Sequence, residues 1–434
     1  MTKGYGQMSI TVRRALRTAL ASCLGVVLAA AALQGPAAAA PRDAGPPAED
    51  PFYKPPVPLP PGRSGDVIRS RPAVFTVDPF GKAPFEGVRS WQVLYRSENV
   101  HGTPIAVSGI VLVPERPWTG EGERPLVSYA VGTRGLGDAC APSYTLTQGL
   151  DYEALMIIDA LNKGWAVAVT DMEGLGTPGG HTYEVGRSQG KAVLNMARAA
   201  RRLPAAGLGG SPVAIWGYSQ GGTSAGWAAQ LAGPYAPDLP VRGVFAGGVP
   251  ADLRAVADGL DGSLFVALMF MAAVGFDSAY PGLNLEGYLN DAGRALLRDA
   301  REMCLTSVDG ASTLLTTAFR RIGDYTTTNP LDDPKWRRAL DANRLGGTAP
   351  KTPVLQTHAV HDQIIPFGQA ETLRRTWCAK GANVTWKTYE FAEHATGMVW
   401  SHPDAMKFIT DRFAGKPVRG NCPRLTWTSA HART

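Results

Sequence analysis

The sequence predicts an α/β fold in which a mainly parallel β-sheet is covered by helices on both faces. From about residue 90 onward, short β-rich runs alternate with helical stretches. This alternation is typical of parallel sheets, because each parallel connection has to cross back over the sheet. A helix-rich segment of about residues 251–345 interrupts the alternation between two strands. We expect this insert to project from the strand ends as a cap.

The predicted elements follow one another in a regular order. Eight strands are expected, of which the first two form an antiparallel pair: Trp91–Arg96, Ile105–Val113, Pro125–Ala130, Trp165–Thr170, Pro212–Trp216, Val241–Phe245, Pro353–Thr357 and Val384–Tyr389. The helices expected between or after them are Tyr152–Asn162, Lys191–Arg202, Thr223–Leu231, Gln369–Cys378 and Pro403–Phe413. In the insert, Leu264–Val274 is almost wholly apolar and Leu285–Glu302 is amphipathic, so both are expected to be helices.

The beginning of the chain has the three parts of a secretory signal peptide. Arg13, Arg14 and Arg17 are positively charged, Leu20–Leu33 is apolar, and the alanines Ala37–Ala40 offer a cleavage site. The apolar run is too short to span a bilayer. We therefore expect residues 1–39 to be a signal peptide that is removed during secretion, with a twin-arginine signal as the alternative export route.

The remaining chain divides into four expected parts. Nine prolines between residues 41 and 61 predict an extended arm, because proline cannot donate the backbone hydrogen bond that a sheet requires. We assign residues 40–85 to this proline-rich arm and residues 86–250 to the first part of the core. Residues 251–345 form the helical cap or lid, and residues 346–434 form the second part of the core.

Charge and cysteine content narrow the class of protein. The net charge is +6, but the first 40 residues hold four basic and no acidic residues, and beyond them 39 basic residues face 37 acidic ones. This balance argues against a nucleic-acid partner. Four cysteines remain after the leader: Cys140, Cys304, Cys378 and Cys422. In an exported protein they predict two disulfides, and spacing alone leaves three pairings open.

Metal binding is the competing interpretation of these cysteines. The sequence has no C-x-x-C pair, and its histidines are scattered. Because structural metal sites usually draw their ligands from such closely spaced residues, we expect no metal site.

The sharpest motif is Gly217-Tyr218-Ser219-Gln220-Gly221, which matches G-x-S-x-G. An apolar run that ends at Trp216 precedes it as a strand, and small residues that can open a helix follow it. In this context the serine is expected on a strained strand-to-helix turn that exposes its hydroxyl, where flanking side chains would collide. We therefore predict that Ser219 is a nucleophile, the alternative being a structural Gly-Ser turn.

A nucleophilic serine needs a base and an acid, which in such folds follow it on loops after later strands. Asp362 follows the strand Pro353–Thr357, and His394 follows the strand Val384–Tyr389. Three other histidines are less suitable as the base, because His358 and His361 flank the acid and His402 is expected to begin the last helix. The order Ser219, Asp362, His394 predicts the α/β-hydrolase fold, with a mainly parallel central sheet and an inserted helical cap.

The oxyanion hole requires backbone N–H groups directed at the developing negative charge. Gln220, directly after the nucleophile, is one expected donor. The other is expected from the loop of residues 131–135, where Thr133 is favoured and Gly132 and Gly135 are alternatives. A Gly-rich turn without any function is also common after a strand.

An acidic pair and an apolar helix can each be interpreted as functional or as structural. Asp171 and Glu173 at a strand end are compatible with a metal site or an acid/base pair, but a buried hydrogen-bonding role is favoured. The apolar helix of the insert either lines an acyl pocket or forms plain cap core. In the first case its substrate-binding residues are Leu264, Phe265, Leu268, Phe270 and Met271.

In combination, these motifs resemble the secretory lipase family, the α/β-hydrolases of fungal lipase-A type and their bacterial relatives. The resemblance includes Asp50-Pro51-Phe52-Tyr53 with the proline arm, Cys140-Ala141-Pro142-Ser143, Asp171–Gly176, Gly217–Gly222 and the loops of Asp362 and His394. It implies a helical lid, a lipophilic ester substrate, no cofactor, and the disulfides Cys140–Cys304 and Cys378–Cys422. The sequence departs from the family at Val131, where bacterial relatives often have histidine, and at Ala359, which replaces a frequent glycine.

The predicted function is that of a secreted serine ester hydrolase. A lipase or carboxylesterase would act on acylglycerols or other lipophilic esters through an acyl-enzyme on Ser219, with a lipid interface as a further partner. We expect no nucleic-acid partner, no stable membrane span and no cofactor. An exported serine peptidase or acyltransferase is an alternative, because the fold does not fix the acyl acceptor. A non-catalytic surface-binding protein is the third possibility.

Overall fold

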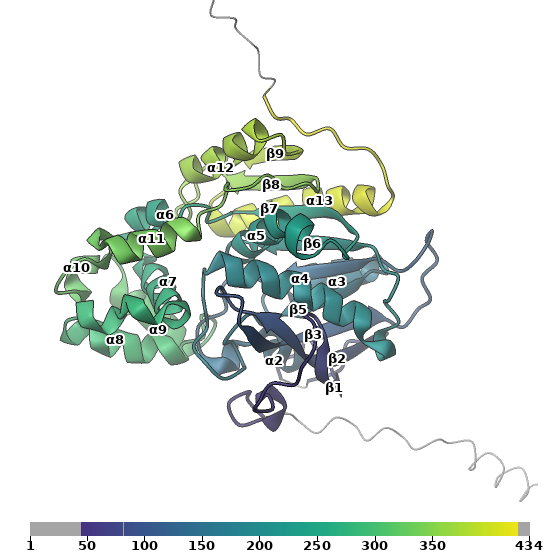
Figure 1. Ribbon diagram of the computed structural model, residues 1–434, viewed down its shortest axis with the longest axis horizontal. Helices are drawn as coiled ribbons and strands as arrows, with labels where there is room; N and C mark the ends of the chain where they lie inside the picture. The colour runs from purple at the N-terminus through teal and green to yellow at the C-terminus, as the bar shows by residue number, and fades with distance from the viewer. Residues whose placement is uncertain (1–44, 81, 424–434) are drawn as a thin grey trace, which may run out of the picture. The chain divides into compact units, whose positions relative to one another are not determined.

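A computed structural model describes residues 45–80 and 82–423 of the chain, and the predicted signal peptide lies outside them. Nine strands in this described part form one sheet, in the order β1-β2-β3-β5-β4-β6-β7-β8-β9 (Figure 1). Their bounds are β1 Val67–Ala73, β2 Val88–Glu98, β3 Pro104–Pro114, β4 Leu126–Ala130, β5 Ala166–Thr170, β6 Val213–Tyr218, β7 Val241–Gly247, β8 Val354–Ala359 and β9 Val384–Tyr389.

The sheet is antiparallel at one side and parallel elsewhere. Strands β1, β2 and β3 pair in antiparallel fashion, and β3 also pairs antiparallel with β5. All remaining neighbours, from β5 through β4, β6, β7 and β8 to β9, are parallel. Every residue of β4, β5, β6 and β8 is buried, as expected for parallel strands covered on both faces. The carboxyl ends of these strands meet at one edge, where the connecting loops can carry functional side chains.

Helices cover both faces of the sheet. On one face, α4 (Gly186–Arg202), α5 (Gln220–Tyr235) and α12 (Phe367–Ala379) share an apolar core with alternate strand residues. On the other face, α2 (Pro142–Gln148), α3 (Ala154–Asn162) and α13 (His394–Phe413) do the same. This arrangement confirms the predicted α/β-hydrolase fold.

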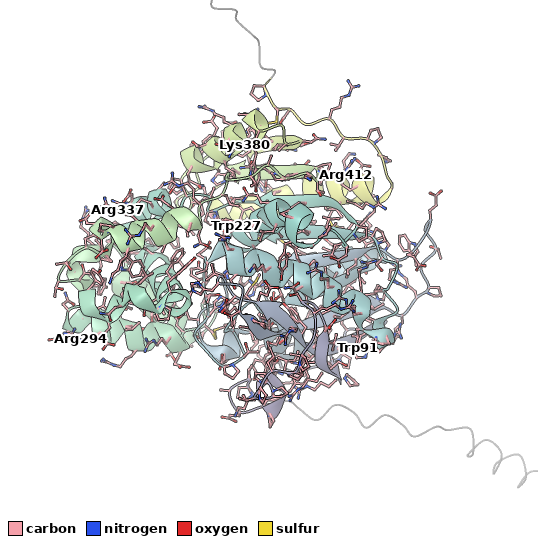
Figure 2. The ribbon with its side chains drawn as sticks, in the orientation of Figure 1. Trp91, Trp227, Arg294, Arg337, Lys380 and Arg412 are labelled. Atoms are coloured by element: carbon pink, nitrogen blue, oxygen red, sulfur yellow. A yellow bond between two sulfur atoms is a disulfide. The ribbon has the colours of Figure 1, made fainter. Side chains whose placement is uncertain are left out.

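Helices α4 and α5 pack closely around Trp227, which is labelled in Figure 2. A Cβ atom at Gly186 would lie 2.1 Å from the Trp227 ring, and one at Gly190 would lie 2.7 Å from Trp227 Cβ. The two glycines of α4 therefore make room for the indole. This packing holds in place the helix that follows the predicted nucleophile.

The segment between β7 and β8 is helical, as the sequence predicts. It contains α6 Leu253–Leu260, α7 Val266–Ala279, α8 Asp291–Glu302, α9 Val308–Thr317, α10 Ile322–Tyr325 and α11 Pro334–Ala342 (Figure 1). We call these six helices the cap. Its apolar core is formed mainly by α7, α8 and α11.

Among the described residues, no single helix is long and apolar enough to cross a membrane. Helix α7 and the following segment Pro281–Tyr288 reach the required length and composition only as a pair, which is bent by 111°.

The structure differs from the sequence prediction at several elements. Strand β1 was not predicted, because it contains Pro72 and two arginines; such a strand is tolerated at the sheet edge, where β1 pairs only with β2. Helix α13 begins at His394 and not at Pro403, because the Glu393 side chain accepts hydrogen bonds from the first-turn amides. The predicted helix Leu285–Glu302 is divided, since Asn290 caps a new helix that begins at the next residue.

Candidate active site

Ser219 lies in the connection between β6 and α5. Its backbone has φ 60° and ψ −124°, a strained conformation for a residue with a side chain. A Cβ at Gly217 would lie 1.9 Å from Gly221 O, and one at Gly221 would lie 2.1 Å from Ala130 O. Only glycine fits at both positions, so the motif has a direct steric cause. The turn places the Ser219 side chain at the carboxyl end of β6.

The structure brings the three predicted triad side chains together. His394 Nε2 lies 2.9 Å from Ser219 Oγ, and His394 Nδ1 lies 2.7 Å from Asp362 Oδ2. Because a carboxylate only accepts hydrogen bonds, Nδ1 carries the imidazole proton and Nε2 accepts the serine hydroxyl. These are the contacts that proton transfer from a serine to a histidine requires.

Backbone groups hold the acid and the base in this arrangement. The other carboxylate oxygen of Asp362 accepts hydrogen bonds from the Ile364 and Ile365 amides, at 3.0 and 2.7 Å. The His394 carbonyl accepts a hydrogen bond of 2.8 Å from the Tyr218 hydroxyl. The side chain of Asp362 is fully buried, so solvent screens its interaction with the His394 imidazole only weakly.

The other histidines of these loops lie outside the hydrogen-bonded chain. His358 is buried and its Nε2 lies 2.9 Å from the Ile365 carbonyl, while burial lowers its pKa. His361 is exposed. His402 was expected to begin the last helix, but it lies inside α13, where its Nε2 contacts Asp159 at 2.8 Å.

The two predicted oxyanion donors come from the elbow itself and from the loop after β4. Gln220 is the first residue of α5, a position at which the amide has no acceptor within its helix. Thr133 is buried on the loop after β4, and its hydroxyl is hydrogen-bonded to the Tyr183 hydroxyl at 2.8 Å. The alternative donor Gly132 is already engaged, because its amide donates to Glu153 Oε1 at 2.7 Å.

An apolar cavity extends from Ser219 into the cap. Its empty space, including the open mouth, measures about 770 Å³. Helices α6, α7 and α11 and the Asp362 loop supply most of its apolar wall, with side chains that include Leu253, Val256, Leu260, Leu268, Met269, Ala272, Ala273, Phe276, Trp336, Leu340, Ile364 and Ile365. Such a wall suits a lipophilic group bound next to the serine.

Of the five predicted substrate-binding residues, only Leu268 lines this cavity. The other four do not line it. Leu264 precedes α7 and is 40 % exposed, and Phe265 packs at the junction with α6. Phe270 and Met271 point into the apolar core of the cap. An all-round apolar helix does not reveal which of its sides faces a cavity, and here Met269, Ala272, Ala273 and Phe276 face it instead.

Glu184, which the sequence analysis missed, also lines the cavity. Its carboxylate accepts a hydrogen bond of 2.7 Å from the Thr223 hydroxyl of α5, and its backbone has a positive φ of 60°. Burial raises the pKa of Glu184 to about 7. A single acidic residue before a helix carries no sequence signal of this kind; only the packing of α4 against α5 and the cap places it in the cavity.

The acidic pair at the end of β5 makes buried hydrogen bonds, the role that the sequence favours. Asp171 accepts hydrogen bonds from both the amide and the hydroxyl of Ser143, and burial raises its pKa to about 6. Glu173 accepts hydrogen bonds from the Ser188 and Thr182 hydroxyls. Among the described residues, no group of three or more His, Cys, Asp or Glu side chains could hold a metal ion.

A second missed residue, His181, supports the first turn of α5. Its Nδ1 lies 3.0 Å from the Glu173 carbonyl and donates to it, while its Nε2 accepts from the Gln220 side-chain amide at 3.2 Å. Burial lowers the pKa of His181 to about 4, so the imidazole is neutral at pH 7. The residue after the predicted nucleophile is thereby fixed to the end of β5.

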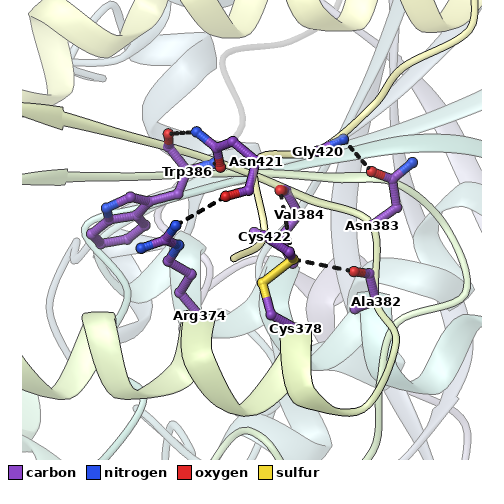
Figure 3. Close-up of a disulfide and its surroundings, with 9 residues drawn as sticks. All are labelled: Arg374, Cys378, Ala382, Asn383, Val384, Trp386, Gly420, Asn421 and Cys422. Carbon is purple, nitrogen blue, oxygen red and sulfur yellow. Dashed lines mark hydrogen bonds between the residues drawn. A yellow bond between two sulfur atoms is a disulfide. The ribbon is translucent and has the colours of Figure 1, made fainter. Parts of the chain in front are cut away.

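The structure contains the two disulfides that the family resemblance implies. Cys140–Cys304 links the loop after β4 to the cap, and Cys378–Cys422 links α12 to the C-terminal segment (Figure 3). Around the second bridge, the Asn421 side chain donates to the Trp386 carbonyl and accepts from its amide, both at 2.7 Å. The C-terminal segment is therefore attached to β9 as well as to α12.

A serine on a strained strand-to-helix turn, hydrogen-bonded to a histidine and through it to an aspartate from later strands, defines a member of the α/β-hydrolase class. The family model described as secretory lipase matches residues 140–421. The chain belongs to the secretory lipase family, as the sequence motifs indicated.

Individual relatives agree with this assignment over most of the chain. A probable inactive lipase of Mycobacterium tuberculosis is 36 % identical over 88 % of this chain and 85 % of its own length. A secreted triacylglycerol lipase of Malassezia furfur is 30 % identical over 71 % of this chain and 82 % of its own. The X-ray structure of Candida antarctica lipase A in its closed state superposes with a TM-score of 0.76 at 27 % identity, covering 89 % of this chain and 92 % of that one.

Proposed function

We propose that the chain is a secreted carboxylic ester hydrolase that cleaves lipophilic esters, acylglycerols included, through an acyl-enzyme on Ser219. The observation that carries this proposal is the hydrogen-bonded chain Ser219–His394–Asp362 at the mouth of an apolar cavity. The polar chain can generate a nucleophile, and the cavity can hold an acyl chain beside it.

The first half of the reaction forms the acyl-enzyme. Ser219 Oγ attacks the ester carbonyl while His394 Nε2 takes its proton, and Asp362 stabilises the imidazolium that results. The carbonyl oxygen becomes an oxyanion, which the amides of Thr133 and Gln220 stabilise. When the C–O bond to the leaving alcohol breaks, His394 returns the proton to the departing oxygen.

The second half of the reaction releases the fatty acid. Water takes the place of the alcohol, His394 Nε2 removes one of its protons, and the hydroxide oxygen attacks the acyl carbon. The same two amides stabilise the second oxyanion, and the proton then passes from His394 to Ser219 Oγ as the acid leaves. Asp362 keeps Nδ1 protonated throughout, so that Nε2 is the nitrogen that exchanges the proton.

The relatives support the substrate class and the location. The name of the Malassezia furfur relative describes a secreted enzyme that acts on triacylglycerols. Two disulfides and the leader of residues 1–39 agree with secretion. The Mycobacterium tuberculosis relative is called a probable inactive lipase, which makes the non-catalytic alternative a concrete one to test.

Hydrolysis of p-nitrophenyl esters of graded chain length, compared with aminoacyl anilides, tests the proposal. We expect hydrolysis of the longer esters, no cleavage of the anilides, and covalent labelling of Ser219 by an alkyl phosphonate. Cleavage of the anilides would favour a peptidase. A folded protein that neither turns over esters nor reacts with the phosphonate would be the non-catalytic alternative.

A further inference from the structure

We propose that Arg134, Asp151 and Glu153 form a buried charged clamp that orients the Thr133 amide toward the oxyanion. These are positioning residues that act through the loop after β4 and touch no substrate. The inference rests on the proposed function, in which Thr133 is the second oxyanion donor. None of the three residues belongs to the Ser219–His394–Asp362 chain.

The clamp is a compact ion network that joins Arg134 of the loop of residues 131–135, here called the oxyanion loop, to Asp151 and Glu153 just before α3. Arg134 Nε and Nη2 donate to the two oxygens of Asp151, at 3.0 and 2.7 Å, and Arg134 Nη1 donates to Glu153 Oε1 at 3.1 Å. The side chain of Arg134 is 4 % exposed, and those of Asp151 and Glu153 are fully buried. The other oxygen of Glu153 accepts a hydrogen bond of 2.6 Å from the Tyr129 hydroxyl.

The clamp also binds the loop backbone itself. Glu153 Oε1 accepts from the Gly132 amide at 2.7 Å, and Arg134 Nη1 donates to the Gly132 carbonyl at 3.2 Å. Tyr152 adds a third backbone contact, since its hydroxyl donates to the Thr133 carbonyl at 3.0 Å. The guanidinium lies 3.8 Å from the centre of the Tyr152 ring, so the two side chains also support each other.

These contacts determine the direction of the Thr133 amide. In a trans peptide the carbonyl oxygen and the next N–H point in opposite directions. Because Arg134 holds the Gly132 carbonyl, the Thr133 N–H must point away from the guanidinium. The Thr133 hydroxyl, bonded to Tyr183 at 2.8 Å, places this residue beside the cavity that contains Ser219, because Tyr183 lines it.

The loop also lies directly against the nucleophile elbow. A Cβ at Gly132 would be 3.6 Å from Tyr218 O, and one at Gly221 would be 3.0 Å from Val131 O. The Gly132 amide is taken by Glu153, so it is not available for an oxyanion. Gly135, the other alternative, lies against Met303 and Cys304 of the cap, where a Cβ would be 2.2 Å from Met303 O. Thr133 therefore remains as the donor of this loop next to the elbow.

The cost of burying these charges supports a positioning role. Ion pairs taken out of water are often no more stabilising than apolar side chains of the same size, because desolvation offsets their attraction. What the arginine supplies here is geometry: a planar fork that reaches two carboxylates and one carbonyl at fixed angles. Lysine has a single nitrogen and cannot make these contacts together.

The cap holds the far end of the same loop. The Arg134 carbonyl accepts a hydrogen bond of 2.7 Å from the Leu305 amide, and Leu136 donates to the Met303 carbonyl at 2.9 Å. The neighbouring Cys140–Cys304 bridge makes this attachment covalent. The loop is therefore held by Asp151 and Glu153 at Gly132 and Arg134, and by the cap at Arg134 and Leu136.

The test uses Arg134→Lys, with Tyr152→Phe as a milder variant that keeps every charge and the aromatic ring. For each protein we would measure kcat and KM for a long-chain p-nitrophenyl ester. We would also measure the inhibition constant of an alkyl boronic acid, which forms a tetrahedral adduct with a nucleophilic serine, and that of an alkyl amide, which resembles the ground state.

Arg198→Lys is the matched control. Arg198 is 8 % exposed and also holds a carboxylate and a backbone carbonyl, those of Asp238 and Tyr235, but it lies on α4 and does not contact the oxyanion loop. Both arginine substitutions should lower the melting temperature. A structural effect alone would therefore appear in both variants.

For Arg134→Lys we expect kcat to fall roughly 10- to 100-fold with little change in KM, because a misdirected donor affects the transition state more than the bound ester. Boronate binding should weaken by a similar factor, and amide binding should not. Tyr152→Phe should show the same pattern with a smaller change, and Arg198→Lys should leave kcat and boronate binding unchanged.

Two results would overturn the inference. One is a folded Arg134→Lys that keeps wild-type kcat and boronate affinity; the other is an equal loss of kcat in Arg198→Lys. If Arg134→Lys does not fold, an unchanged Tyr152→Phe would overturn it instead. Failure of the proposed function would look different, because the wild type itself would then neither hydrolyse the ester nor bind the boronate.

Discussion

The carboxyl end of the sheet and the cap differ in the kind of contact that each offers to a substrate: polar and specific at the sheet end, apolar in the cap. At the sheet end, Ser219, His394 and Asp362 are held by specific hydrogen bonds from backbone and side chains. In the cap, α6, α7 and α11 offer an almost wholly apolar wall in which position matters more than identity. The comparison indicates that the sheet end governs whether the proposed reaction occurs, and the cap governs which ester fits.

The largest effect is expected at the sheet end. Ser219→Ala should lower kcat by three or more orders of magnitude, because it removes the nucleophile of the proposed reaction. His394→Ala should lose a comparable amount, while Asp362→Asn should keep somewhat more activity, since it removes orientation and charge support only. Steady-state kinetics on a p-nitrophenyl ester provides the measurement, with circular dichroism as the check of folding. A folded Ser219→Ala with more than about a tenth of wild-type kcat would show that another group is the nucleophile.

Removal of either disulfide should lower stability, but only one of the two should also affect activity. Cys140–Cys304 closes a segment of 164 residues and Cys378–Cys422 one of 44, so they should contribute about 5 and about 4 kcal/mol, respectively. Replacing either pair by serines should lower the denaturant midpoint. Only the Cys140/Cys304 pair should also lower kcat, because it fixes the loop that carries Thr133 to the cap. Equal kcat values for both double variants would contradict this distinction.

Glu184 lies in the cavity between the sheet end and the cap, and it should make the free energy of unfolding depend on pH. Burial raises its pKa from 4.5 to about 7, so the unfolded chain releases this proton at lower pH than the folded protein does. Folding stability is therefore lost as pH rises from about 4.5 to 7, and the loss then levels off, at about 3 kcal/mol for the full shift. Glu184→Gln should remove this loss.

The measurement is the difference in unfolding free energy between Glu184→Gln and wild type at several pH values. As the pH rises from 4.5 to 7, we expect the unfolding free energy of the variant to increase relative to that of the wild type. Other buried groups contribute equally to both proteins: burial also raises the pKa of Asp171, to about 6, and lowers that of His181, to about 4. A difference that does not change with pH would show that Glu184 is not a buried titrating carboxyl.

The sequence predicted the sheet end better than the cap for a physical reason. Parallel strands buried on both faces, such as β4, β5, β6 and β8, are seen in the sequence as short apolar runs. All strands from β2 to β9 were expected close to their observed bounds. The elbow motif and the order of Ser219, Asp362 and His394 depend on local sterics and topology, which leave a local signature. Strand β1 left none, because an edge strand with one neighbour tolerates proline and charge.

What the sequence missed depends on packing between distant segments. Arg134, His181 and Glu184 are single polar residues whose roles arise from partners on other elements, such as Asp151, Gln220 and Thr223. In the cap, α7 is apolar on every side, so periodicity cannot distinguish the side that lines the cavity from the side that packs in the core. For this reason Phe270 and Met271 were expected at the cavity, although they pack in the apolar core of the cap.

The smallest expected effect is a change of chain-length preference, and it depends on which side of α7 is altered. Ala272 lines the cavity, whereas Ala267 is 2 % exposed and does not. Each acyl methylene buried against the wall should be worth about 0.8 kcal/mol, or about a fourfold preference, until the cavity ends. Ala272→Trp should fill part of the cavity and move the preferred acyl chain to a shorter length, with little loss at short chains.

Ala267→Trp is the control for this prediction. Its indole would meet packed protein and not free space, so it should lower the melting temperature and leave the order of preference among chain lengths unchanged. The readout is kcat/KM across p-nitrophenyl esters of increasing length for both variants. If a stably folded Ala272→Trp kept the wild-type profile, the acyl chain would have to lie elsewhere, and the cap would lose its proposed part in selectivity while the chemistry at Ser219 stayed intact.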